Sequence, residues 1–122
     1  MEKKGNLLVI DDEIGPRESL RILFNDEYNV EVARSGEEGL EILNKQRFDL
    51  VILDLKMPGM GGIEVLKEIR SADSGIKVVV LTGYGSPETA KKVSRIGISA
   101  YLNKPFDISE IRELVHQEIN GR

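Results

Sequence analysis

The chain has 122 residues, of which 40% are apolar and 31% charged, and its formal net charge at pH 7 is −4. This length fits one domain with a single core, and this composition is typical neither of a disordered chain nor of a membrane protein. The acidic balance argues against direct binding to nucleic acid, which needs a basic face. With no cysteine, no apolar run long enough for a bilayer and no signal segment, we expect one cytoplasmic domain over residues 1–122.

Apolar runs alternate with helix signals in the first half of the chain. Residues 7–10 are typical of a buried strand, and the helix that follows them to about residue 25 has Pro16 near its first turn. Residues 29–33 alternate as a strand does. Ser35 and Glu38 then form a capping-box pattern, which predicts a helix that ends near residue 46.

The second half continues the alternation. Residues 50–53 predict a strand, because the prolines and glycines that follow exclude a continuing helix. Further strands are expected at 76–81 and 99–102. Helices are expected after residue 62 until the chain reaches about residue 71, from Ser86 to Gly97, and after Asp107. The apolar face of the last helix is predicted to comprise Ile108, Ile111, Val115 and Ile119.

Five strand–helix alternations predict an α/β doubly wound domain, in which a five-stranded parallel sheet has its five helices distributed over both faces. Ligands bind such sheets outside the carboxyl ends of the strands. The polar residues at those ends are Asp11, Asp12, Asp54, Thr82 and Lys104. We therefore expect three carboxylates, a hydroxyl and an ammonium in one pocket.

Clustered carboxylates repel one another, and Mg²⁺ is a hard cation that such oxygens bind. A carboxylate can also act as a nucleophile and form an aspartyl-phosphate. With Lys104 to neutralise a phosphoryl group and Thr82 to donate a hydrogen bond to it, the residues predict Mg²⁺-dependent phosphoryl transfer to Asp54. Taken singly, each residue has a simpler reading: Asp11 and Asp12 as helix caps, Asp54 and Thr82 as turn residues, Lys104 as a solvated charge.

Four strand-end segments together resemble the receiver domain of two-component response regulators: residues 9–13, 53–59, 81–83 and 102–106. The resemblance extends over about residues 5–120 and implies the flavodoxin-like strand order 2-1-3-4-5. It implies that a sensor histidine kinase phosphorylates Asp54. It also implies that Asp12 ligates Mg²⁺ directly, Asp11 through water, and Lys56 through its backbone carbonyl.

The resemblance further implies a switch. Lys104 would pair with the phosphoryl group, the Lys104-Pro105 bond would be cis, Thr82 would move toward the phosphate, and Tyr101 would turn inward. The face formed by the fourth helix, fifth strand and fifth helix would then change to control an output domain or partner. From its residue type alone, Tyr101 fits a half-buried strand aromatic as well as it fits a switch residue.

Two positions tune the phosphoryl lifetime in this family, and here they are Lys56 and Tyr84. Neither can orient an attacking water with a carboxylate or amide, so we expect slow to moderate autodephosphorylation. Homodimerisation on activation is common in the family. Residues 82–90 resemble receivers attached to transcriptional activators of the nitrogen-regulation type.

Other classes fit the residues less well. A haloacid-dehalogenase-like phosphatase needs a second aspartate where Lys56 stands, and a flavin carrier needs a phosphate loop where residues 11–13 are acidic. A receiver that acts in a phosphorelay is a third possibility, whereas the full acidic set argues against a degenerate receiver that signals without phosphate. We expect that the chain is not an enzyme and that it catalyses only its own phosphorylation and dephosphorylation. His116, the only histidine, is expected to lie mid-helix without a partner cluster, as a surface or packing residue rather than a ligand or phosphoryl donor.

Overall fold

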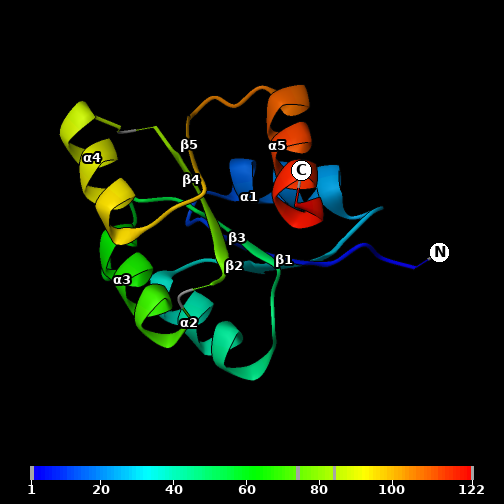
Figure 1. The fold of residues 1–122 in the computed structure, drawn as a ribbon, viewed down its shortest axis with the longest axis horizontal. Coiled ribbons are helices and arrows are strands. Elements are labelled where there is room, and N and C mark those ends of the chain that lie inside the picture. The colour runs from blue at the N-terminus through cyan, green and yellow to red at the C-terminus, as the bar shows by residue number, and fades with distance from the viewer. Residues whose placement is uncertain (1, 74, 84, 122) are drawn as a thin grey trace.

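The computed structural model describes residues 2–73, 75–83 and 85–121, in which strands and helices alternate (Figure 1). The strands are β1 (Asn6–Ile10), β2 (Asn29–Ala33), β3 (Leu50–Leu53), β4 (Lys77–Thr82) and β5 (Ala100–Asn103). The helices are α1 (Ile14–Phe24), α2 (Gly36–Lys45), α3 (Gly62–Ala72), α4 (Pro87–Ile96) and α5 (Ile108–Asn120). The predicted elements are confirmed, with β1 beginning one residue earlier than expected and β4 and β5 each beginning and ending one residue later.

The five strands form one parallel sheet in the order β2-β1-β3-β4-β5. The predicted doubly wound α/β class and strand order are therefore confirmed. In the register of the central strands, Leu53 lies opposite both Ile10 and Val80. Because the strands are parallel and in this register, the residues that follow β1, β3 and β4 lie at the same edge of the sheet.

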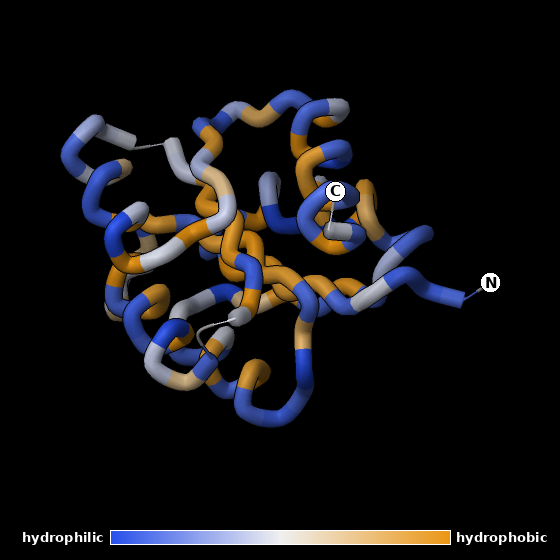
Figure 2. The backbone as a smooth tube through the Cα atoms, viewed as in Figure 1, coloured by the Kyte–Doolittle hydropathy of each residue, from blue (hydrophilic) through white to orange (hydrophobic). Residues whose placement is uncertain are grey.

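The sheet lies between two helical layers, with α2, α3 and α4 on one face and α1 and α5 on the other (Figure 1). Successive residues of a strand point to opposite faces, so Leu8 packs in the cluster under α3 and α4, whereas Leu7 packs in the cluster under α1 and α5. Figure 2 shows the apolar residues concentrated along the central strands. Each fully buried leucine contributes about 1.5–3 kcal/mol of transfer free energy, so two-sided burial explains the continuous apolar runs.

Three helices have the caps that the sequence predicts. The Ser86 and Asp107 side chains accept hydrogen bonds from the N–H groups three residues later. Ser35 likewise accepts from the Glu38 N–H at 3.1 Å. In a capping box the Glu38 carboxylate would accept a hydrogen bond from the Ser35 N–H. Here it accepts instead from the Arg34 N–H at 2.7 Å. Such caps stabilise a helix by about 1 kcal/mol each.

One residue of the predicted apolar face of α5 lies elsewhere. Ile108 is 60% exposed, whereas Ile111 and Val115 are fully buried. The reason is its position as the first residue of α5, where it borders a surface hollow beside Lys104 instead of the core.

His116 lies within α5, as predicted, but the prediction that it has no partner cluster is wrong. Its Nε2 lies 3.1 Å from Glu27 Oε1, and the same carboxylate accepts from Lys4 Nζ and Arg112 Nη2, each at 3.1 Å. Hydrogen bonds from Lys4 first, and also from His116 and Arg112, lower the pKa of Glu27 to about 2. Glu27 lies in the connection between α1 and β2, so local sequence around His116 gives no sign of it. The cluster ties α5 to the opposite end of the sheet from the acidic residues.

Candidate functional site

Backbone hydrogen bonds continue the sheet by one step beyond the strands and place the functional side chains. The Asp54 N–H donates to the Ile10 carbonyl at 3.0 Å, and the Lys104 N–H donates to the Thr82 carbonyl at 3.0 Å. Each functional residue is thus fixed by the strand next to its own. The edge that the sequence predicts as the binding site is held together by the sheet ladder itself.

Three carboxylates meet at this edge. Asp11, Asp12 and Asp54 each offer an oxygen, and these atoms all lie within 4.8 Å of one another. Asp11 is 2% and Asp54 3% exposed. The Oδ1 atom of Asp12 is buried and has no hydrogen-bond partner among the residues that the structure describes. Buried polar atoms are nearly always satisfied, so an orphaned oxygen beside two further carboxylates fits a hard divalent cation such as Mg²⁺.

Lys104 supplies the positive charge of the site. Its Nζ lies 2.8 Å from Asp11 Oδ2, 2.9 Å from Glu13 Oε1 and 3.5 Å from Asp54 Oδ2. Burial alone would lower the pKa of Lys104, but the hydrogen bonds with Asp11 and Glu13 outweigh it and raise the pKa above its usual value. The ammonium thus shares one pocket with the carboxylates, as the sequence predicts, and Lys104 stays charged at physiological pH. The Lys104-Pro105 bond is cis, as expected.

The environment of Asp54 opposes its ionisation. Burial raises the pKa of Asp54, and the charge of Asp11 raises it further, while Lys104 and the Lys56 N–H lower it in part. That N–H lies 3.3 Å from Asp54 Oδ1. A carboxylate in this position is not fully compensated by the protein alone, so a further cation would complete the site.

Asp54→Asn should therefore raise the melting temperature at pH 7 in EDTA. The pKa of Asp54 is higher in the folded than in the unfolded protein, where it is about 3.9. The stability that this difference provides is fully present below the unfolded pKa, and it is lost as the pH rises through the folded pKa. The substitution removes this loss, and we expect a gain of about 1 kcal/mol, or roughly 3–6 °C. Thermal melts by circular dichroism at pH 7 and pH 4 measure it, with the gain smaller at pH 4. An unchanged or lower melting temperature at pH 7 would contradict the repulsion between these carboxylates.

The two predicted switch residues lie on neighbouring strands. Thr82 is fully buried at the end of β4. Tyr101 in β5 lies opposite Val80, and its hydroxyl is buried with no hydrogen-bond partner within the described part of the chain. Burial raises the pKa of this hydroxyl. Gly85 leaves the room for it, since a Cβ at that position would collide with the Tyr101 hydroxyl. Tyr84 lies outside the described residues, so its predicted lifetime role stays a prediction.

Two residues contact the site without a role assigned from the sequence. Glu13 reaches Lys104, and Arg17, only 7% exposed, donates from Nη1 to the Asp11 carbonyl at 3.0 Å. Glu13 directly follows Asp11 and Asp12 after β1, and this position in the sequence is a signal that could have placed it at the site. Arg17 gives no such signal, because an arginine in an amphipathic helix is normally a surface residue. Its guanidinium adds a second positive charge behind the acidic cluster.

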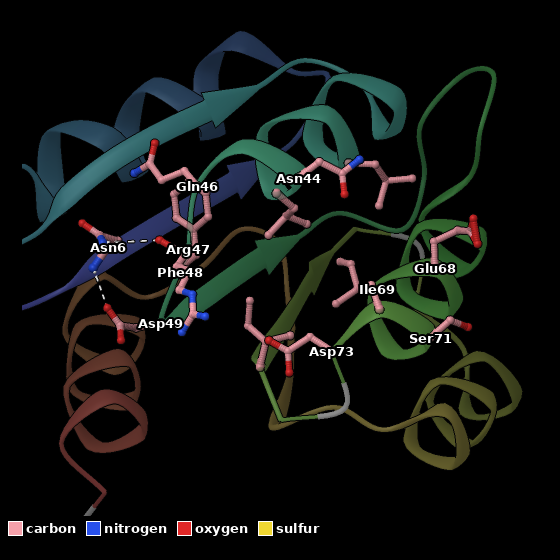
Figure 3. Close-up of a pocket in the computed structure, with 14 residues that line it drawn as sticks. Asn6, Asn44, Gln46, Arg47, Phe48, Asp49, Glu68, Ile69, Ser71 and Asp73 are labelled. Carbon is pink, nitrogen blue, oxygen red and sulfur yellow. Dashed lines mark hydrogen bonds between the residues drawn. The ribbon is translucent and has the colours of Figure 1, made fainter.

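Two surface hollows differ in their relation to this edge. One of ≈ 650 Å³ borders Lys104 and has Pro16, Leu23 and Phe106 in its wall. Another, of ≈ 950 Å³, lies between α2 and α3 at the opposite edge, where Asn6 donates from its backbone N–H to Asp49 at 2.7 Å (Figure 3). The second hollow is remote from the carboxylates and the ammonium. Among the helices of the described ranges, none is both long and apolar enough to cross a membrane.

A family model described as the response regulator receiver domain matches residues 7–116. The chain belongs to the response regulator receiver family. Sporulation initiation phosphotransferase F of Bacillus subtilis is 42% identical over 110 residues, which make up 89% of each protein. The transcriptional regulatory protein ZraR of Escherichia coli is 37% identical over 115 residues, or 93% of this chain but 26% of that protein.

Solved receiver structures have the same fold. A CheY-like receiver domain protein from Methanospirillum hungatei superposes with a TM-score of 0.91 at 28% identity, over 95% of this chain and 94% of that one. NtrX from Brucella abortus gives a TM-score of 0.89 at 27% identity, over 96% of this chain and 27% of that one. The expected likeness to receivers of nitrogen-regulation-type activators is thus confirmed. The chain spans about a quarter of those regulators.

Proposed function

We propose that the chain is a phosphorylation-activated switch in which Asp54 accepts a phosphoryl group from a sensor histidine kinase or a small phosphodonor. The observation that carries this proposal is the position of Asp54, which is 3% exposed and lies beside two further carboxylates and the Lys104 ammonium. Membership of the receiver family supports the same role. The chain would catalyse only its own phosphorylation and dephosphorylation.

Asp11, Asp12, Asp54 and the backbone carbonyl of Lys56 would hold Mg²⁺. The orphaned Asp12 oxygen and the mutual approach of the carboxylates support this assignment. Bound Mg²⁺ would neutralise charge on the oxygens of the phosphoryl group. Receiver domains as a family bind Mg²⁺ through acidic residues, and the acidic cluster here fits that property.

The chemistry is a transfer between two nucleophiles. An oxygen of Asp54 forms a bond to phosphorus, and the bond from phosphorus to the donor nitrogen or oxygen breaks, with its electron pair leaving on the donor. Lys104 keeps its proton and balances charge on the phosphoryl oxygens. Thr82 donates its hydroxyl to one of them. The protein thus supplies a positioned nucleophile and fixed positive charge rather than a proton-transfer group.

The signal would leave the site through β4 and β5. Two states of Thr82 and Tyr101, biased by the charge on Asp54, would change the face formed by α4, β5 and α5. Within the described ranges the buried Tyr101 hydroxyl has no hydrogen-bond partner. An unsatisfied buried hydroxyl costs about 1–3 kcal/mol, which makes the placement of Tyr101 sensitive to small changes nearby. Lys56 and Tyr84 would set a slow to moderate loss of the phosphoryl group.

The partners follow from the site and the relatives. A kinase must bring its donor to Asp54, and the apolar hollow beside Lys104, with Ile108 60% exposed at its rim, offers a contact surface close to that point. Receivers act with histidine kinases and with output domains, and this chain would control an attached output domain or a separate protein in the cytoplasm. A homodimer on activation would use the α4–β5–α5 face.

Chemical trapping tests the acceptor. An aspartyl-phosphate is an acyl phosphate, so borohydride reduction converts the modified aspartate to homoserine. After incubation with acetyl phosphate and Mg²⁺, we expect peptide mass spectrometry to place homoserine at position 54 and at no other aspartate. Homoserine at Asp11 or Asp12, or at no position, would contradict the proposal.

A further inference from the structure

The Lys104 ammonium is shared between three acceptors, and the acceptor outside the aspartate cluster is Glu13. Nζ lies 2.9 Å from Glu13 Oε1 but 3.5 Å from Asp54 Oδ2. The ammonium is therefore closer to Glu13 than to the proposed phosphoryl acceptor. Lys104 donates a hydrogen bond to Glu13, and that bond is the first cause of the lowered pKa of Glu13.

Among the described residues, Lys104 is the only hydrogen-bond partner of the Glu13 side chain. Glu13 is the N-cap residue of α1, yet its side chain caps no N–H of that helix. Its side chain is 61% exposed, in contrast to the 3% of Asp11, the other close acceptor. An exposed carboxylate is readily rehydrated when the ammonium leaves it, so Glu13 can release Lys104 more easily than a buried aspartate can.

We propose that Glu13 is a positioning residue that holds the Lys104 ammonium on the α1 side of the site and competes with the incoming phosphoryl group for it. The inference rests on the proposed function. When a phosphoryl group occupies Asp54, the ammonium shifts from Glu13 toward the phosphoryl oxygens. Glu13 thus weakens the binding of the phosphoryl group at the site.

The test compares Glu13→Gln with wild type and with Glu18→Gln, a matched control. Glu18 lies on the same helix and pairs with Arg21 rather than Lys104. The affinity for beryllofluoride in the presence of Mg²⁺, measured by titration of amide resonances, reports phosphoryl-like binding. The lysine ammonium resonances of the metal-free protein report the Glu13–Lys104 contact independently.

We expect Glu13→Gln to bind beryllofluoride about two- to five-fold more tightly, the effect of one half-exposed ion pair, and to shift the Lys104 ammonium resonance. Glu18→Gln should do neither. Unchanged or weaker binding by Glu13→Gln overturns the inference, and so does tighter binding without a change at Lys104, since that reports only charge removal. Failure of wild type itself to bind beryllofluoride would instead count against the proposed function.

Discussion

Gly62→Ala should lower the free energy of unfolding by about 1–3 kcal/mol, the cost of overpacking at a site that cannot relax. A Cβ on Gly62 would lie 2.5 Å from the backbone oxygen of Asp54 and closer still to the Cα of Leu55. Both are backbone atoms, so the segment that carries the acceptor would have to move. The Gly62 N–H also donates to the Leu55 carbonyl at 3.0 Å, which fixes α3 directly behind the site.

Gly61→Ala is the matched control, because a Cβ at Gly61 meets nothing within 4 Å. Urea unfolding followed by circular dichroism gives both free energies. We also expect Gly62→Ala to gain phosphate from acetyl phosphate more slowly than Gly61→Ala, because Asp54 is displaced. Equal stabilities of the two variants would show that the backbone at residues 54–55 yields freely, contrary to the packing described above.

Lys104→Met should destabilise the metal-free protein by about 2–4 kcal/mol at pH 7, because removing one partner of a buried ion pair leaves the other charges uncompensated. The Lys104 side chain is 12% exposed, and its partners Asp11 and Asp54 are 3% and 4% exposed. Without the ammonium, the already raised pKa of Asp54 rises further. Stability is then lost as pH rises through that value, so the deficit should be smaller at pH 4 than at pH 8.

Added Mg²⁺ should recover part of this loss, since a cation that binds only the folded protein stabilises it. Lys77→Met serves as the control. Its Nζ lies 3.6 Å from Glu118 and its side chain is 46% exposed, so its loss should cost no more than about 1 kcal/mol. Thermal melts across pH, with EDTA or Mg²⁺, make the comparison. A pH-independent deficit in Lys104→Met would show lost packing rather than unpaired carboxylates.

The sequence predicts most where local signals and sheet topology agree. The apolar run before Asp54 predicts a two-sided buried strand, and parallel topology then brings Asp11, Asp54 and Lys104 to one edge, as observed. Ser86 and Asp107 cap their helices as their residue types predict. These inferences need only short segments and the rule that ligands bind at the carboxyl ends of strands.

Side-chain contacts between distant segments could not be predicted. His116 meets Glu27, 89 positions away, and Arg17 turns inward to the Asp11 carbonyl from an otherwise amphipathic helix. Each contact depends on how α1 and α5 sit against the sheet, which hydrophobic periodicity alone does not determine.

Asp54 is proposed to accept a phosphoryl group with the help of Mg²⁺. The most direct measurement is intact mass after incubation with acetyl phosphate, with and without Mg²⁺, on wild type and Asp54→Asn. We predict that wild type gains one phosphoryl group from acetyl phosphate only when Mg²⁺ is present, and that Asp54→Asn gains none. An adduct on Asp54→Asn, an adduct on wild type equally formed in EDTA, or no adduct under any condition would contradict the account.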